Sequence, residues 1–132
     1  MNEPQWVNYH KHSSLSNVYT TDSPITVNDY LIELKNRYGS EPCVYSCVEH
    51  GWAGNYFKIY DDIEKFNKKN NTNIKFVFGI EAYWVKDRLT KDSSNCHIVI
   101  LARNDNGRNQ INKMLSVANK TGYYYKPRID LS

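Results

Sequence analysis

Apolar and polar residues along this chain follow two alternating periods, one typical of strands and one typical of helices. Short apolar runs predict four strands, at residues 5–9, 43–48, 75–85 and 95–102. Apolar residues three and four positions apart predict three helices, at residues 28–38, at residues 55–70 and from residue 106 or 107 to residue 120. Strands and helices that alternate in this way indicate an α/β fold built from parallel βα units.

Local signals refine three of these elements. Asn28 is expected to cap the first helix, and Gly39 is expected to stop it. Gly122 is expected to stop the third helix. Residues 98–101 are continuously apolar, as expected for a strand buried on both faces.

Composition bounds the class of protein. With 132 residues, the chain can form one domain at most. Its net charge of +3 permits contact with nucleic acid without arguing for it. No apolar run reaches the length of a membrane span, so no membrane partner is expected. The three cysteines lack zinc-finger spacing, which fits a reducing, cytoplasmic setting.

Chemically active side chains lie near the ends of the predicted strands. His10 and His12 are one residue apart, so in an extended segment their rings point to the same side. The other members of this set are His50, Glu81 and His97, and the set therefore holds all four histidines of the chain. Loops that follow parallel strands converge on one side of a fold, where sites are built.

Other roles remain open for several of these residues. His97 starts its apolar run, so a core or capping histidine is an equal alternative. Glu81 lies within an apolar stretch, where a buried carboxylate needs a partner or a metal ion. Glu49 is expected to orient the His50 imidazole by a hydrogen bond rather than bind metal itself. Asp22 lies in a polar loop and by itself indicates a turn.

Histidine and carboxylate ligands together suit zinc, manganese or iron, and more than four ligands indicate more than one ion. Neighbouring ions of this kind clamp a phosphate and generate hydroxide at neutral pH, which is the chemistry of phosphoester hydrolysis. Near the end of the chain, residues 123–128 are aromatic and basic. This segment could stack on bases and hold a phosphate through Lys126 and Arg128, or it could equally be a packing edge.

Five segments together resemble the PHP (polymerase and histidinol phosphatase) domain family. They are His-Lys-His-Ser at 10–13, Glu-His-Gly at 49–51, Gly-Ile-Glu-Ala-Tyr at 79–83, His-Ile-Val-Ile-Leu-Ala-Arg-Asn at 97–104 and Gly-Tyr-Tyr-Tyr-Lys-Pro-Arg-Ile-Asp at 122–130. The last segment resembles in particular the N-terminal PHP domain of bacterial and phage DNA polymerase III alpha subunits.

The resemblance implies a distorted (β/α)7 barrel with up to three divalent metal ions. By position, it implies that His10, His12, His50, Glu81 and His97 are metal ligands, with Glu81 bridging. Asp22 is a candidate for a further acidic ligand. Catalysis would pass through metal-bound hydroxide held by His10, His12, His50 and Glu81.

The family's barrel is longer than this chain, so residues 1–132 are expected to be the N-terminal portion of a single PHP domain, about its first four strands. The unpaired edge of the sheet is then expected to associate with a partner, either the remainder of a polymerase chain or a complementary fragment. The implied activity is metal-dependent 3′→5′ exonuclease cleavage of single-stranded DNA ends during replication. The alternatives are a catalytically silent docking module and a small-molecule phosphatase of the histidinol-phosphate type.

Overall fold

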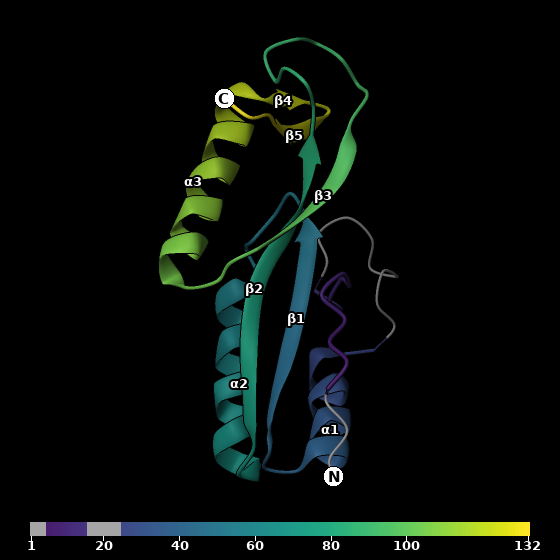
Figure 1. Cartoon of the computed structure of the whole chain (residues 1–132), viewed down its shortest axis with the longest axis vertical. Helices are drawn as coiled ribbons and strands as arrows, with labels where there is room; N and C mark the ends of the chain where they lie inside the picture. The colour runs from purple at the N-terminus through teal and green to yellow at the C-terminus, as the bar shows by residue number, and fades with distance from the viewer. Residues whose placement is uncertain (1–4, 16–24) are drawn as a thin grey trace.

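The computed structural model describes residues 5–15 and 25–132, in which helices and strands alternate along the chain (Figure 1). The elements are α1 (Val27–Tyr38), β1 (Pro42–His50), α2 (Tyr56–Asn70), β2 (Asn73–Trp84), β3 (Cys96–Leu101), α3 (Asp105–Thr121), β4 (Tyr123–Tyr124) and β5 (Lys126–Ile129). All three predicted helices are present, and the short β4–β5 hairpin is an addition to the prediction. Within the described residues, no helix has both the length and the apolarity that crossing a bilayer requires.

The sequence predicts one end of α1 correctly and the other end incorrectly. The helix begins after Thr26, whose hydroxyl accepts a hydrogen bond from the Asp29 amide at 3.1 Å. The prediction that Asn28 caps this helix is therefore wrong, because the cap lies two residues earlier. Gly39 ends the helix with a φ of 60°, a conformation that glycine adopts without steric cost, and this confirms the predicted stop.

The central strand, β2, has partners on both of its edges. β1 runs parallel to it, and β5 follows β1 along the same edge with two parallel residue pairs. On the other edge β3 runs antiparallel, so the sheet is mixed and the prediction of parallel units throughout is wrong. Residues 85–95, which join β2 to β3, hold no helix, whereas a parallel connection needs a longer crossover that is usually helical.

Residues 5–9 do not form the strand that their apolar pattern predicts. The segment runs beside β1, but a side chain makes much of the contact. The Gln5 amide accepts a hydrogen bond from Val44 N at 2.6 Å and donates one to Val44 O at 2.8 Å. Further along, Val48 N donates to Lys11 O at 2.9 Å. A side-chain amide therefore takes the place of part of the backbone ladder.

The described helices pack on one face of the sheet and leave the other face to the histidines. Successive residues of a strand point to opposite faces, so Ile80 and Ala82 of β2 contact the α3 core, whereas Glu81 and Tyr83 face away from it. One buried cluster joins α1, α2, β1 and the start of β2: Val27, Leu31, Leu34, Cys43, Tyr45, Cys47, Ile59, Ile63 and Ile74. A second joins β2, α3 and β5: Phe78, Ile80, Ala82, Ile111, Leu115, Ala118 and Ile129.

Strand β3 is more exposed than its sequence predicts. Its side chains are exposed or half-buried, with Ile98 43% and Leu101 39% exposed. The expectation of a strand buried on both faces is therefore wrong for the described residues. Among them β3 pairs only with β2, so its second edge and part of its apolar surface remain open.

Arg128 of β5 has a structural role. It is 2% exposed, and its guanidinium donates hydrogen bonds at 2.6–2.9 Å to four backbone carbonyls. These belong to Arg88, Thr90, Asp92 and Gly122. The contacts fasten the loop of residues 85–95 to the hairpin. The prediction that Arg128 contacts phosphate is wrong, because the side chain is buried and its donors are directed at the protein's own backbone.

Replacing Arg128 with alanine is expected to lower the free energy of unfolding by roughly 3 kcal/mol or more, because the hydrogen bonds of a buried guanidinium to four backbone carbonyls are lost. Urea denaturation measures the change. The matched control is Arg103→Ala, since Arg103 is exposed, and its effect should stay within about 0.5 kcal/mol. Equal stabilities for the two variants would contradict the structural role of Arg128.

The cysteines provide a second test of the fold. Burial raises the pKa of the Cys47 thiol to about 12 and also raises that of Cys43, whereas Cys96 is exposed. Iodoacetamide at pH 8 should therefore alkylate only Cys96 in the native protein, and all three cysteines after unfolding in urea, as counted by mass spectrometry. Rapid native labelling of a Cys96→Ser variant would contradict the position of β1 in the core.

Candidate metal centre

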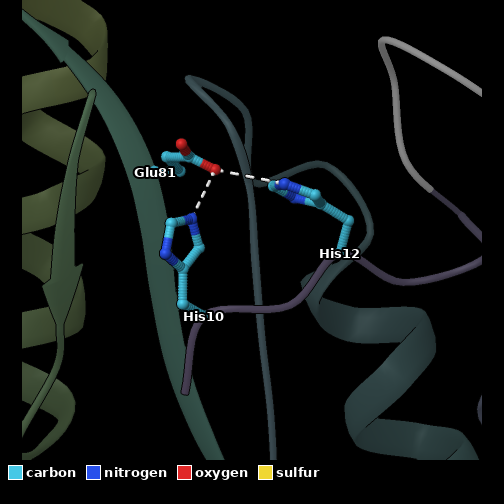
Figure 2. Close-up of side chains that lie close together, drawn as sticks. All are labelled: His10, His12 and Glu81. Carbon is cyan, nitrogen blue, oxygen red and sulfur yellow. Dashed lines mark ion pairs between the residues drawn. The ribbon is translucent and has the colours of Figure 1, made fainter. Parts of the chain in front are cut away.

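Four imidazoles surround the carboxylate of Glu81, which lies on β2 and is 4% exposed. On Oε2 the ring nitrogens are His10 Nε2 at 3.1 Å, His12 Nε2 at 3.1 Å and His50 Nδ1 at 3.7 Å. On Oε1 the partner is His97 Nδ1 at 2.6 Å. Figure 2 shows how His10 and His12 approach the carboxylate from one short segment of chain. The five side chains thus form one cluster around a single buried acid.

Strand pairing explains how distant segments reach this point. In the parallel register His50 pairs with Glu81, so the last residue of β1 lies directly beside the carboxylate. In the antiparallel register His97 pairs with Tyr83, two residues beyond Glu81 and on the same face of the sheet. The four histidines therefore come from three separate parts of the chain: the segment of His10 and His12, the end of β1, and the start of β3, which runs opposite to the predicted direction.

The tautomer of His12 makes the cluster chemically unusual. Its Nδ1 lies 2.6 Å from the carbonyl oxygen of Val48, and a carbonyl only accepts, so Nδ1 carries the hydrogen. In the neutral ring this leaves a lone pair on Nε2, which faces Glu81 Oε2 at 3.1 Å. Two electron-rich atoms face each other at this distance only when a proton or a metal ion lies between them.

The donor set fits divalent metal ions. One group of mutually close ligand atoms comprises His10, His12 and Glu81, and a second comprises His50, Glu81 and His97. Within each group the ligand atoms lie within 4.8 Å of one another. Glu81 belongs to both groups, so its two oxygens can serve two neighbouring ions. Imidazole and carboxylate together suit zinc, manganese or iron.

The charge of Glu81 suits this role. Burial acts to raise the pKa of its carboxyl, but hydrogen bonds with His10 and His97 and the charge of His50 outweigh burial and hold the pKa below its ordinary value. The group is therefore an anion at neutral pH. A buried anion of this kind needs positive charge nearby, from protonated imidazoles or from a cation.

Three polar side chains behind the cluster fix the segment that carries His10 and His12. Glu49 Oε1 accepts a hydrogen bond from Ser13 N at 2.9 Å and another from Asn55 Nδ2 at 3.1 Å. Asn55 also donates to Ser13 Oγ at 3.2 Å. The sequence predicts that Glu49 orients His50, whereas these contacts place its carboxylate on the opposite side of β1, where it holds the chain beyond His12.

Lys11 anchors the same segment from the side of the helices. Its ammonium lies 3.7 Å from the centre of the Tyr45 ring and 4.3 Å from that of Tyr30, so the chain between the two histidines is attached to the α1–β1 core. Burial lowers the pKa of Lys11 to about 8, and nearby Cys47 and Glu49 partly oppose this shift. The alternation that points Lys11 into the core points both histidines to the other face.

Tyr83 and Lys126 form a wall of the cluster. The Tyr83 ring lies near-parallel to His50 at 6.2 Å and edge-on to His97 at 5.1 Å. The Lys126 ammonium lies 4.5 Å from the centre of the same ring, and its side chain is exposed. Only the Tyr83 ring therefore separates Lys126 from His50 and His97, so an anion bound at the cluster could reach the Lys126 ammonium.

The structure separates the sequence candidates into those it brings together and those it does not. His97 is half-exposed and contacts Glu81, which excludes the core and capping alternatives. Asp22 lies outside the described residues, so its place relative to the cluster stays a prediction. Sequence reasoning missed Ser13 and Asn55, since each has the appearance of a loop or helix-cap residue. It also missed Tyr83, although its position two residues after Glu81 on a strand indicates the same face.

Comparisons with known proteins give a family and two relatives. A family model described as PHP domain matches residues 8–132. The chain is 34% identical over 137 residues to the DNA polymerase III subunit alpha of Aquifex aeolicus (strain VF5), covering 95% of this chain and 11% of that protein. It is 29% identical over 134 residues to the protein of the same name from Borreliella burgdorferi, covering 96% of this chain and 10% of that protein. The chain thus spans about one-tenth of the length of these relatives.

Replacing Glu49 with alanine is expected to weaken zinc binding by the cluster about 10- to 100-fold, because the segment of His10 and His12 loses its support. Isothermal titration calorimetry measures the affinity. Glu49→Gln keeps an acceptor oxygen for the Ser13 amide and should retain most of the affinity, and Glu64→Ala on the exposed side of α2 is the control. An affinity unchanged in Glu49→Ala would show that the histidines need no such support.

Proposed function

This chain belongs to the PHP domain family, and from this premise we propose that it forms the leading part of the PHP domain of a replicative DNA polymerase. In this proposal residues 1–132 are the N-terminal portion of one domain. The domain acts in the cytoplasm on phosphodiester bonds at single-stranded 3′ ends. Its reaction is metal-dependent hydrolysis of the 3′→5′ exonuclease type.

The observation that carries this proposal is the shared position of Glu81. One carboxylate belongs to two groups of potential ligands, and the other members of both groups are histidines. A structural metal site commonly has one closed set of four ligands, whereas two adjacent sets around a shared acid are typical of hydrolytic centres. The match to the PHP family favours the same interpretation.

The four histidines differ in exposure, so the cluster has a buried side and a side open to solvent. His12 and His50 are 18% and 12% exposed, so they hold their positions within the protein, whereas His10 and His97 are 58% and 41% exposed. A phosphate would therefore approach from the side of His10 and His97. Divalent ions held by these ligands would polarise the phosphodiester and lower the pKa of a bound water.

The remainder of the polymerase chain, or a complementary fragment, is the proposed structural partner. Within the described part of the chain, the outer edge of β3 has no strand beside it, and Ile98 and Leu101 are exposed there. An apolar edge of this kind favours the addition of a further strand. The complete site would hold up to three ions, with zinc, manganese or iron as candidates, and the isolated chain is expected to turn over slowly at most.

Glu81→Gln tests the function, with Glu64→Gln as a matched control on exposed helix surface. Manganese or zinc should raise the melting temperature of the unmodified chain and of Glu64→Gln, but not that of Glu81→Gln, because the shared ligand is lost. The unmodified chain and Glu64→Gln should release mononucleotides from a single-stranded 3′ end, and Glu81→Gln should not. A chelator should stop the release.

Other outcomes separate the alternatives. Metal-dependent stabilisation without nucleotide release from either the chain or its complex with the remaining polypeptide would favour a docking module. Hydrolysis of a small phosphomonoester but not of a 3′ end would favour a phosphatase of the histidinol-phosphate type. Absence of any metal effect on melting would contradict the metal centre altogether.

A further inference from the structure

The tip of the β4–β5 hairpin presents an exposed aromatic ring next to an exposed cation. Tyr125 is the residue between the two strands and is 75% exposed, and Lys126 follows it at the start of β5. The Tyr124 ring lies 4.6 Å from that of Tyr125 and edge-on to it. The hairpin therefore carries Tyr125 outward, supported from beneath by a second ring.

The backbone at this tip is costly for tyrosine. Tyr125 has a φ of 59°, in the left-handed region that glycine adopts readily and that a residue with a Cβ adopts at a steric cost. Neither the two buried core clusters nor their half-buried neighbours include Tyr125, so burial in the core does not compensate for this cost. Residues held in strained backbone conformations cluster at active sites and ligand clamps.

The hairpin lies against the wall of the candidate metal centre. Lys126 covers Tyr83, whose ring contacts both His50 and His97. The next residue, Pro127, packs closely against Gly51, since a Cβ built on Gly51 would lie 3.0 Å from Pro127 Cγ. The tip is thus attached to the strand end that carries His50, rather than to a distant surface.

We propose that Tyr125 and Lys126 hold the single-stranded nucleic acid whose end enters the candidate site, Tyr125 by stacking on a base and Lys126 by binding a backbone phosphate. This inference rests on the proposed function and adds a substrate contact to it. A strand with its terminal phosphodiester at Glu81 carries further phosphates and bases along its length, at a rise of about 3.4 Å per nucleotide where the bases are stacked as in a duplex. An exposed ring beside a cation is the combination that binds single strands without sequence preference.

Fluorescence anisotropy of a labelled oligothymidylate, measured in chelator so that hydrolysis cannot occur, tests the aromatic contact. Tyr125→Ala should weaken binding by about fivefold or more, and Tyr125→Phe should bind like the unmodified chain because the ring is kept. Phe57→Ala is the matched control, since Phe57 is 76% exposed on α2, and should have no effect. Equal affinities for Tyr125→Ala and Phe57→Ala, or no binding by the unmodified chain at low salt, would overturn the proposal.

The salt dependence of the same binding tests the cation. Lys126→Gln should reduce the slope of log affinity against log salt by about 0.7, the value for one phosphate contact on a single strand. Lys113→Gln, an exposed lysine of α3, should leave the slope unchanged. Equal slopes in both variants would overturn the role of Lys126.

Tyr125→Gly distinguishes a binding role from a packing role. Glycine relieves the backbone cost, so the melting temperature should stay the same or rise while oligothymidylate binding falls as in Tyr125→Ala. A lower melting temperature with unchanged binding would show that the ring packs rather than binds. Binding in chelator that depends on Tyr125, without metal-dependent hydrolysis, would support this inference and overturn the proposed function. Metal-dependent hydrolysis with binding that does not depend on Tyr125 would support the proposed function and overturn this inference.

Discussion

The structure depends on one buried negative charge, the carboxylate of Glu81 in the middle of the sheet. An ionised carboxylate away from water is costly unless positive charge or hydrogen-bond donors surround it. Here four imidazoles from three other parts of the chain supply them. The end of β1, the register of β3 and the path of the N-terminal segment are all consistent with this requirement, because each brings at least one histidine to the same two oxygens.

The sheet separates stability from chemistry by its two faces. Apolar residues on one face pack with the helices, and the residues between them carry the cluster on the other face. The N-terminal segment repeats this division at small scale, since Lys11 reaches the tyrosines of the core while His10 and His12 reach Glu81. Contacts of Glu49 and Asn55 with Ser13 then hold the segment in place. A site exposed to solvent is in this way supported by buried polar groups.

The sequence allowed the cluster to be predicted better than the sheet. Period-two alternation and the positions near strand ends group Glu81 with the four histidines, because these signals are local. Spacing leaves the role of His97 open, and the family resemblance implies that all five residues are ligands. The predicted parallel direction of β3 is wrong, although the lack of a helical pattern in residues 85–95 indicates a hairpin between β2 and β3. The role of Arg128 could not be predicted, since it depends on carbonyls of a loop distant in sequence. The same holds for Glu49, whose partner Ser13 lies beyond a helix.

Long-range ¹H–¹⁵N NMR of the histidine rings, recorded before and after addition of zinc, tests most directly whether Glu81 organises a metal centre. The account predicts that zinc shifts ring nitrogens of all four histidines, that His12 keeps its proton on Nδ1 toward Val48 while its Nε2 responds, and that Glu81→Gln abolishes the coordinated response. Spectra unchanged by zinc would show a cluster held by protons alone, and a response confined to the exposed His10 and His97 would show zinc bound at the surface without Glu81 as the shared ligand; either result would contradict the account.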